Sequence, residues 1–159
     1  EPEIAAWVAA THGIQPSSAL FHAVVEKRHL ATPDGIAVDA EGRVTLAEIK
    51  TTNKSWRTIP RHYLRQVWWQ QHVLGAERTL FAWEEHRDFR PLHEEPRTMW
   101  IDRDEKEIAN LVSMATQLID ELYRLTTGQN VPQDNLSPRE QAILRAATQD
   151  AYRALALID

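Results

Sequence analysis

Residues Pro33–Lys50, PDGIAVDAEGRVTLAEIK, decide the fold expected for this chain because they predict a β-hairpin. The first strand is the apolar run Gly35–Asp39, and the second is Arg43–Lys50, in which apolar and polar residues alternate. The residues between the strands, with Gly42 last, have the composition of a tight turn. The sequence therefore predicts two antiparallel strands with a short connection.

Three charged side chains gather at the open end of this hairpin. Residues two apart on a strand point to the same face, so Glu48 and Lys50 project together. Asp34 stands at the mouth of the first strand, and a hairpin this short brings it close to them. Two nearby carboxylates repel each other unless a cation joins them, and hard oxygen ligands suit Mg²⁺ or Mn²⁺. The hairpin thus predicts a small acid–lysine site able to bind a divalent metal.

The composition is that of an ordinary globular domain. The chain has 159 residues, 43% of them hydrophobic and 26% charged, which suits one domain with a real core. It has no cysteine, and its seven histidines form no HxH or HxxxH pair, so disulfides, thiolate chemistry and a zinc site are not expected. No stretch is typical of a membrane span or a signal peptide. The first residue is Glu rather than Met, which predicts that the natural chain begins further upstream.

The net charge is −5, but the charge is unevenly distributed. Six basic residues and one acid lie between positions 43 and 65, whereas the acidic surplus lies elsewhere. A basic band on an acidic protein is typical of a phosphate-binding face, although a solvated charged loop gives the same pattern. On the first interpretation, the residues expected to meet a DNA backbone are Lys54, Arg57, Arg61 and Arg65.

The remaining sequence predicts one layered α/β structure. Pro60 suits the first turn of a helix and Gly75 its C-terminal cap, while the polar segment 84–96 has two prolines and is typical of a loop. The other expected elements are strands over Leu20–Val25, Arg78–Trp83 and Arg97–Ile101, and helices over Glu1–Thr11, Pro60–Leu74, about 103–125 and about 137–158. The prediction is an α/β (α+β) fold: a single mixed β-sheet of about five strands flanked by helices, with extra C-terminal helices.

Four features occur in order: Pro33-Asp34-Gly35, Glu48-Ile49-Lys50, a basic loop, and a helix that carries Tyr63 and Gln66. This series resembles the PD-(D/E)xK nuclease superfamily, and within it the lambda-exonuclease-like branch of YqaJ-like viral recombinases. The resemblance implies a restriction-endonuclease-like core over about Glu1–Leu125. It implies that Asp34, Glu48 and the main-chain carbonyl of Ile49 bind Mg²⁺, with Mn²⁺ able to substitute. Lys50 would be the catalytic lysine, and Gln66 the helix glutamine beside the site.

The resemblance also implies a further acidic metal ligand on a helix upstream. Glu1 matches the family's Gly-x-x-x-Glu pattern with the Gly lost, and Glu3 is the alternative. The helix departs from the family at Gln70, which stands where nucleases of the RecB type have Tyr. The predicted domain organisation is a nuclease core over 1–127 and a helical extension of the same domain over 128–159.

The predicted function is that of a Mg²⁺-dependent DNA nuclease, and the resemblance favours a phage-type exonuclease that acts on DNA ends in recombination and repair. Family members work with a single-strand annealing protein and some are trimers, so both associations are expected, in the cytoplasm of a bacterium or a phage-infected host. The alternatives are a restriction-type or structure-specific endonuclease, a DNA-binding module with a degenerate site, and an interaction protein whose C-terminal helices dock on a partner. The intact Asp34, Glu48 and Lys50 favour an enzyme over the degenerate module.

Overall fold

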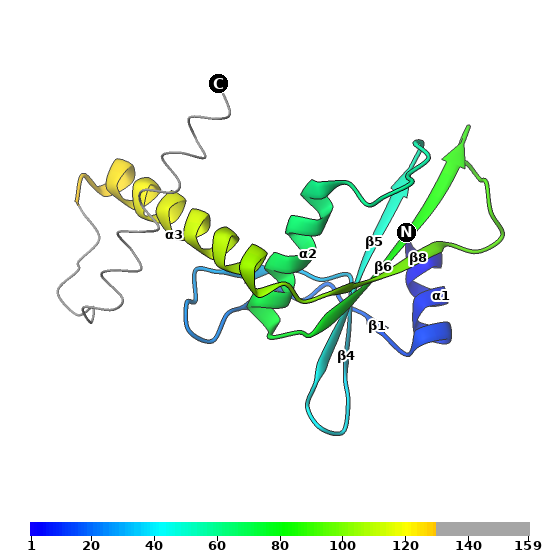
Figure 1. The fold of residues 1–159 in the computed structure, drawn as a ribbon, viewed down its shortest axis with the longest axis horizontal. Helices are drawn as coiled ribbons and strands as arrows, with labels where there is room; N and C mark the ends of the chain where they lie inside the picture. The colour runs from blue at the N-terminus through cyan, green and yellow to red at the C-terminus, as the bar shows by residue number, and fades with distance from the viewer. Residues whose placement is uncertain (130–159) are drawn as a thin grey trace. The chain divides into compact units, whose positions relative to one another are not determined.

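A computed structural model of the chain describes residues 1–129, and Figure 1 shows its fold. Its helices are α1 (Pro2–His12), α2 (Arg61–Leu74) and α3 (Glu105–Thr127). Its strands are β1 (Gln15–Pro16), β2 (Phe21–His22), β3 (Leu30–Ala31), β4 (Gly35–Val38), β5 (Val44–Thr52), β6 (Arg78–Arg87), β7 (Arg90–Pro91) and β8 (Arg97–Asp102). The chain forms two compact units, one over Glu1–Asp104 and a second that begins at Glu105.

The first unit is built on a mixed sheet. Over residues 1–129 this sheet has six strands, in the order β1-β4-β5-β6-β7, with β8 also paired to β6. The central strands β5 and β6 are parallel, and all their other pairings are antiparallel. A parallel pair needs a crossover connection, which here is the helix α2. The predicted α/β fold, a mixed sheet flanked by helices, is confirmed.

The hairpin predicted at Pro33–Lys50 is present as β4 and β5. Gly42 closes its turn with φ of +78°, a left-handed conformation that glycine adopts without strain. Gly35 is needed for a different reason: a Cβ atom there would lie 3.0 Å from the Cβ of Ala47 and 3.1 Å from a methyl group of Ile14. A side chain at position 35 would therefore require these neighbours to move by a few tenths of an ångström.

The sheet has two covered faces, because alternate residues of a strand point to opposite sides. Helix α1 packs on one of them, here called the α1 face, and α2 packs on the other, the α2 face (Figure 1). The α1 face contains Ile4, Val8, Ile14, Ala47, Ile49, Leu80 and Ala82. The α2 face contains Ile59, Val67, Phe81, Trp83 and Ile101. Because Glu48 lies between two residues of the α1 face, its side chain points to the α2 face.

The strand predicted over Leu20–Val25 is wrong in extent. Only Phe21–His22 is a strand, and it pairs with β3 in a separate two-stranded sheet. The backbone of Ala23 bonds to that of His29 at 2.9 Å, so the chain turns back at once. Val24 and Val25 fall in this turn and are 92% and 99% exposed. The apolar composition of Leu20–Val25 therefore predicts a longer and more buried strand than the one present.

The loop predicted over 84–96 is also partly wrong. Strand β6 continues to Arg87, because Glu84 and Glu85 still pair with the end of β5. Asp88 and Phe89 then form a tight turn with positive φ, and β7 returns along β6. Parallel pairing to a nine-residue β5 extends this strand through a polar sequence that composition alone assigns to a loop.

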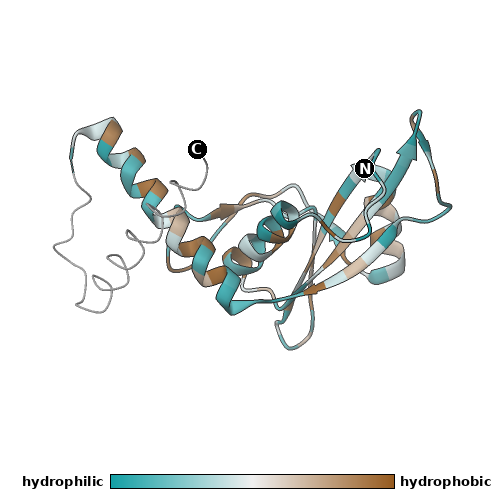
Figure 2. Ribbon diagram, turned by 45° about the horizontal axis from the view of Figure 1, so that its top comes forward, coloured by the Kyte–Doolittle hydropathy of each residue, from teal (hydrophilic) through white to brown (hydrophobic). Residues whose placement is uncertain are grey.

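The second unit opens with α3, and the predicted helix over about 103–125 is confirmed. Apolar and polar bands alternate along α3 in Figure 2, as expected of an amphipathic helix. The predicted last helix, and the extension from residue 130 onward, lie outside the described residues. Among the helices of residues 1–129, none combines the length and the apolar character that a membrane crossing requires.

Candidate active site

The open end of the hairpin brings Asp34 to β5, as predicted. The register pairs Gly35 with Ala47, and its continuation sets Asp34 opposite Glu48. The Oδ2 atom of Asp34 accepts a hydrogen bond of 2.7 Å from the backbone N–H of Ile49. A side-chain carboxylate therefore continues the hydrogen bonding of β5 where the strand β4 has ended.

Glu48 is the centre of the site. It is 1% exposed, and its carboxylate forms an ion pair with the ammonium of Lys50. Its Oε1 atom accepts a hydrogen bond of 2.7 Å from Gln66, and its Oε2 atom one of 2.8 Å from Gln70. The two glutamines lie four residues apart and so share one face of α2. The helix that covers the sheet thus supplies two amide donors to a buried carboxylate.

Gln70 was not among the predicted site residues. The spacing of Gln66 and Gln70 predicts that both lie on one face of the helix, but the resemblance assigns a role only to Gln66, because Gln70 occupies a Tyr position. The signal that identifies it is its spacing from Gln66, since a residue four positions further along a helix meets the same neighbour.

Burial and neighbouring charges both shift the pKa values of Glu48 and Lys50. Burial raises the pKa of Glu48 and the charge of Asp34 raises it further, while hydrogen bonds from Lys50 and Gln70 oppose the shift. Burial lowers the pKa of Lys50, but its hydrogen bond to Glu48 and the charges of Glu48 and Asp34 outweigh burial, so the pKa is raised overall. One ammonium therefore faces two neighbouring carboxylates and balances the charge of only one of them, so a second cation would relieve the repulsion that remains.

The oxygen atoms here suit a hard divalent cation. Continuation of the register sets Pro33, which has no N–H, opposite Ile49, so the hairpin has no donor for the Ile49 carbonyl. That carbonyl lies on the same edge of β5 as Asp34, because the N–H and C=O of a strand residue point to one side. The Oε1 atom of Gln70 is buried without a hydrogen-bond partner among the described residues, as an acceptor for a metal-bound water would be. Asp34, Glu48 and the Ile49 carbonyl are thus a donor set that fits Mg²⁺ or Mn²⁺.

The structure does not bring Glu1 into this group. Glu1 precedes α1, its side chain is 66% exposed, and its amino group lies 3.8 Å from the carboxylate of Glu3. Within residues 1–129, no three or more His, Asp or Glu side chains gather in a way that would hold a metal. The physical reason is topological: α1 packs on the α1 face, whereas Glu48 points to the α2 face.

The four basic residues predicted to meet DNA are all exposed. Lys54 and Arg57 lie in the loop between β5 and α2, and Arg61 and Arg65 lie in the first two turns of α2. Arg65 directly precedes Gln66, which contacts Glu48. The basic band therefore follows the same strand–loop–helix connection that carries the site.

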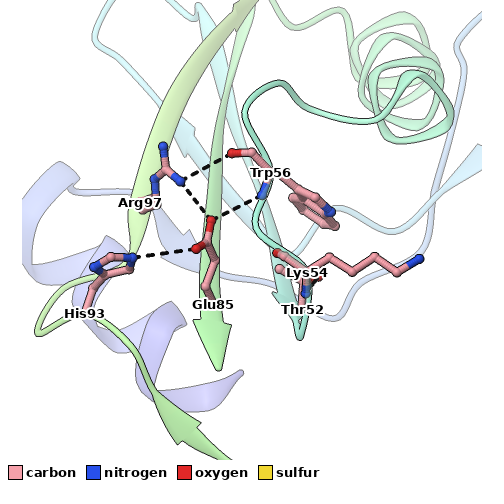
Figure 3. A network of polar contacts seen from close by, with 6 residues as sticks. All are labelled: Thr52, Lys54, Trp56, Glu85, His93 and Arg97. Atoms are coloured by element: carbon pink, nitrogen blue, oxygen red, sulfur yellow. Dashed lines mark hydrogen bonds and ion pairs between the residues drawn. The ribbon is translucent and has the colours of Figure 1, made fainter. Parts of the chain in front are cut away.

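A second buried carboxylate, in a segment that the sequence predicts to be a loop, lies near the carboxyl end of β6. Glu85 is 4% exposed, and its Oε1 atom accepts hydrogen bonds of 2.8 Å from Arg97 and 3.4 Å from the backbone N–H of Trp56 (Figure 3). Its Oε2 atom lies 3.7 Å from a ring nitrogen of His93. Burial alone would raise the pKa of Glu85, but these donors outweigh burial and lower it. The carboxylate therefore ties a loop residue after β5 to the neighbouring strands.

The fold, a mixed sheet covered by helices on both faces, has counterparts among solved structures. Among solved structures, the chain is similar to an alkaline exonuclease from Laribacter hongkongensis, LHK-Exo, with a TM-score of 0.54 and 22% sequence identity. The similar region covers 80% of this chain and 70% of that one, and the structure of LHK-Exo in complex with dAMP matches equally well. No protein-family model matches the chain, and neither does any curated protein sequence. At 22% identity this likeness shows the fold alone, and that fold is the one that the resemblance implied.

Proposed function

We propose that this protein is a metal-dependent deoxyribonuclease, and that it is an exonuclease acting on DNA ends in recombination or repair. The observation that carries the proposal is the arrangement around Glu48: a buried carboxylate held by Lys50, Gln66 and Gln70, with Asp34 beside it. Such a group is unfavourable for a fold on its own, because the desolvation of a buried ion pair can cost more free energy than the pairing returns. The similarity to LHK-Exo supports the same reading.

Each residue of the site suits one task in phosphodiester hydrolysis. Bound Mg²⁺ would lower the pKa of a coordinated water and offset charge on the phosphate. Asp34, Glu48 and the Ile49 carbonyl would hold the ion. The Lys50 ammonium donates hydrogen bonds, so it suits the attacking water and the charge that builds on the phosphate oxygens. Attack by water forms one phosphorus–oxygen bond and breaks another, which leaves a phosphate monoester on one product and a hydroxyl on the other.

Two side chains from α2 support this chemistry. Gln66 and Gln70 hold the two oxygens of Glu48, which fixes the orientation of a proposed metal ligand. The exposed Lys54, Arg57, Arg61 and Arg65 would meet the phosphates of the DNA backbone. Action with a strand-annealing partner and assembly into a trimer remain predictions from the family resemblance.

The test is cleavage of end-labelled linear duplex DNA with Mg²⁺, with Mn²⁺ and with neither. We expect the unmodified protein to release nucleotides only with metal, and Lys50→Ala and Glu48→Ala to be inactive while their circular dichroism spectra stay unchanged. Glu41→Ala, an exposed carboxylate in the hairpin turn, is the matched control and should cut normally. Full activity of both site variants would refute the mechanism.

Closed circular DNA distinguishes the alternatives. An exonuclease leaves it intact, whereas cutting of the circle would identify an endonuclease on the same site. A module that merely binds DNA would cut neither substrate and need bind no Mg²⁺ at Asp34 and Glu48, which calorimetric titration of the metal would show.

A further inference from the structure

A cavity of about 510 Å³ lies at the carboxyl end of β5, and the proposed function gives a role to only one of its lining residues, Lys54. This volume falls within the range of about 300–1,000 Å³ that is usual for small-molecule sites. Its charged and aromatic lining consists of Lys54, Trp56, His62, Tyr63 and His86, and the remaining lining residues are Thr, Asn and Pro. None of the residues that line it has a carboxylate. The lining therefore suits a ligand that combines a flat ring with negative charge.

The cavity adjoins the candidate active site. Tyr63 lines it, and the Nζ atom of Lys50 lies 5.4 Å from the centroid of the Tyr63 ring. Tyr63 and Gln66 are three residues apart on α2, so the same stretch of helix serves the cavity and the Glu48 carboxylate. A group bound in the cavity would thus lie next to the proposed position of the reacting phosphate.

The walls of the cavity are aromatic. The ring centroids of Trp56 and Tyr63 are 5.3 Å apart, and those of His62 and Tyr63 are 4.0 Å apart. Trp56 and Tyr63 are only partly buried, so each ring packs on the α2 face and still meets solvent. Aromatic rings placed in this way stack on nucleic acid bases with little regard to sequence, because every base has a π face.

The position of Trp56 is fixed by the buried Glu85. The backbone N–H of Trp56 donates to Glu85, and its carbonyl accepts a hydrogen bond of 3.3 Å from Arg97, which itself bonds to Glu85 (Figure 3). The backbone N–H of Lys54 is likewise held by Thr52, at 3.0 Å. Figure 3 shows the Lys54 side chain extended on the side of the Trp56 ring, away from Glu85. A loop residue with no part in catalysis is thus anchored at both backbone atoms, which is expected of a preorganised binding wall.

We propose that this cavity binds one unpaired deoxynucleotide of the DNA strand, next to the bond that is cut. The base lies against Trp56 and Tyr63, and the adjacent phosphate lies near Lys54. Glu85 and Arg97 are positioning residues, because they act only through Trp56. This inference rests on the proposed function and adds to it a subsite that takes a nucleotide of any sequence.

The test is photochemical cross-linking of the full chain to DNA, with Ca²⁺ in place of Mg²⁺ so that the strand is not cut. 5-Iododeoxyuridine is placed at successive positions from the end of a duplex with a short overhang, and cross-linked peptides are identified by mass spectrometry. We expect one or two adjacent positions to give most of the product, on Trp56 or Tyr63. An even yield along the strand, or cross-links confined to Trp68 and Trp69, would overturn the proposal.

Variants give a second measurement by fluorescence anisotropy of a labelled overhang oligonucleotide. Trp56→Ala should weaken binding about tenfold, as expected for loss of one stacked base. Trp56→Phe keeps a ring and should restore most of the affinity, which separates stacking from a fault in folding. Equal binding by Trp56→Ala, Trp56→Phe and the unmodified chain would refute the subsite.

Charge and positioning are tested in the same assay. Lys54→Ala should weaken binding several-fold, while Lys27→Ala, an exposed lysine outside the cavity, should have no effect. Glu85→Gln should lower the cross-linking yield at Trp56 without changing the position that reacts. Unchanged yield in Glu85→Gln would remove the positioning role.

The outcomes separate this inference from the proposed function. A protein that fails to cut DNA with any metal but still cross-links at Trp56 would retain the nucleotide site and lose the nuclease assignment. A protein that cuts DNA but cross-links elsewhere would retain the nuclease assignment and lose this site.

Discussion

The two faces of strand β5 differ in a way that separates stability from chemistry. On the α1 face, Ala47 and Ile49 pack among apolar side chains of α1 and β6. On the α2 face, Glu48 and Lys50 form a buried ion pair that two glutamines of α2 complete. Four consecutive residues thus alternate between a dry core and a polar site, because the side-chain period of a strand is two.

The difference shows how a fold accommodates an unfavourable charge. The raised pKa of Glu48 means that its charged form is less stable in the folded protein than in water. Apolar packing on the opposite face of the same strand offsets that cost, since Ala47 and Leu80 are fully buried. Substitutions on the α2 face should therefore lower DNA cleavage more than stability, and substitutions on the α1 face should do the reverse. Four predictions test this comparison.

The largest effect is expected from Glu48→Gln. We expect the rate of DNA cleavage to fall by at least about 10²–10³-fold, as for removal of one group that stabilises a transition state. We also expect the free energy of unfolding at pH 7, measured with urea in EDTA, to change little, because two effects of the carboxylate oppose each other. Burial raises the pKa of Glu48, so its charge opposes folding, but that charge also raises the pKa of Lys50 and so stabilises the ammonium beside it.

Glu41→Gln is the matched control for both measurements, because Glu41 is exposed in the turn of the same hairpin. A clear loss of stability in Glu48→Gln would contradict the comparison, since it would make Glu48 a structural residue.

Ile4→Ala should show the reverse. Ile4 is 2% exposed on the α1 face, and its truncation should lower the free energy of unfolding by about 2–5 kcal/mol. Cleavage per folded molecule should not change at a temperature where the variant is folded. Loss of activity in a fully folded sample would instead show that α1 contributes to the site, which would favour the predicted role of Glu1.

A pH titration of stability tests the polar cluster at the edge of α2. His29 is 3% exposed, and its Nδ1 atom lies 3.1 Å from the Nε2 atom of His72. Burial lowers the pKa of His29 below 6.5, so at mildly acidic pH the unfolded chain takes up the proton first. The stability is therefore fully present above about pH 6.5 and falls as the pH is lowered, by at most about 1.4 kcal/mol per pH unit for one group.

Urea midpoints between pH 5 and pH 8 measure this effect, which His29→Gln should reduce and His12→Gln should not. His12 is exposed at the end of α1 and serves as the control. Identical pH curves for all three proteins would show that His29 does not set the acid sensitivity.

The smallest effect is expected from Arg65→Ala. Loss of one phosphate contact should lower the slope of log affinity against log salt by about 1, with only a several-fold loss of affinity at low salt. Binding of duplex DNA in Ca²⁺ at several salt concentrations measures the slope, and Lys27→Ala is the control. An unchanged slope in Arg65→Ala would place the DNA away from α2.

Much of this arrangement was predictable because its signals are local. The alternation from Val44 to Lys50, the Gly42 turn and the apolar spacing of α2 specify a hairpin and a helix from nearby residues. Asp34, Glu48 and Lys50 come together because the register of a short hairpin sets the start of β4 opposite the middle of β5. The parallel pairing of β5 with β6 is not local, and it extends β6 through Glu84 and Glu85, which have the composition of a loop.

The differences between prediction and structure have the same origin. Leu20–Val25 has the composition of a strand, but burial depends on which residues pack against it in space. Val25 is almost fully exposed. Glu1 matches a sequence pattern, but the helix that follows it packs on the face opposite Glu48. Glu85 carries no local signal, because its role depends on Arg97 and Trp56, which are distant in the chain.

Gly35 sets a limit on how this site can be re-engineered. A side chain at position 35 would press against Ala47 and Ile14, and relief of that contact would move β4 away from β5. The neighbouring Asp34 would move with it and lose its hydrogen bond to Ile49. A methyl group that alters no functional group would thus shift a proposed metal ligand by a few tenths of an ångström, unless Ala47 and Ile14 move instead. In a library selected for cleavage, position 35 should accept as few amino acids as Asp34 itself.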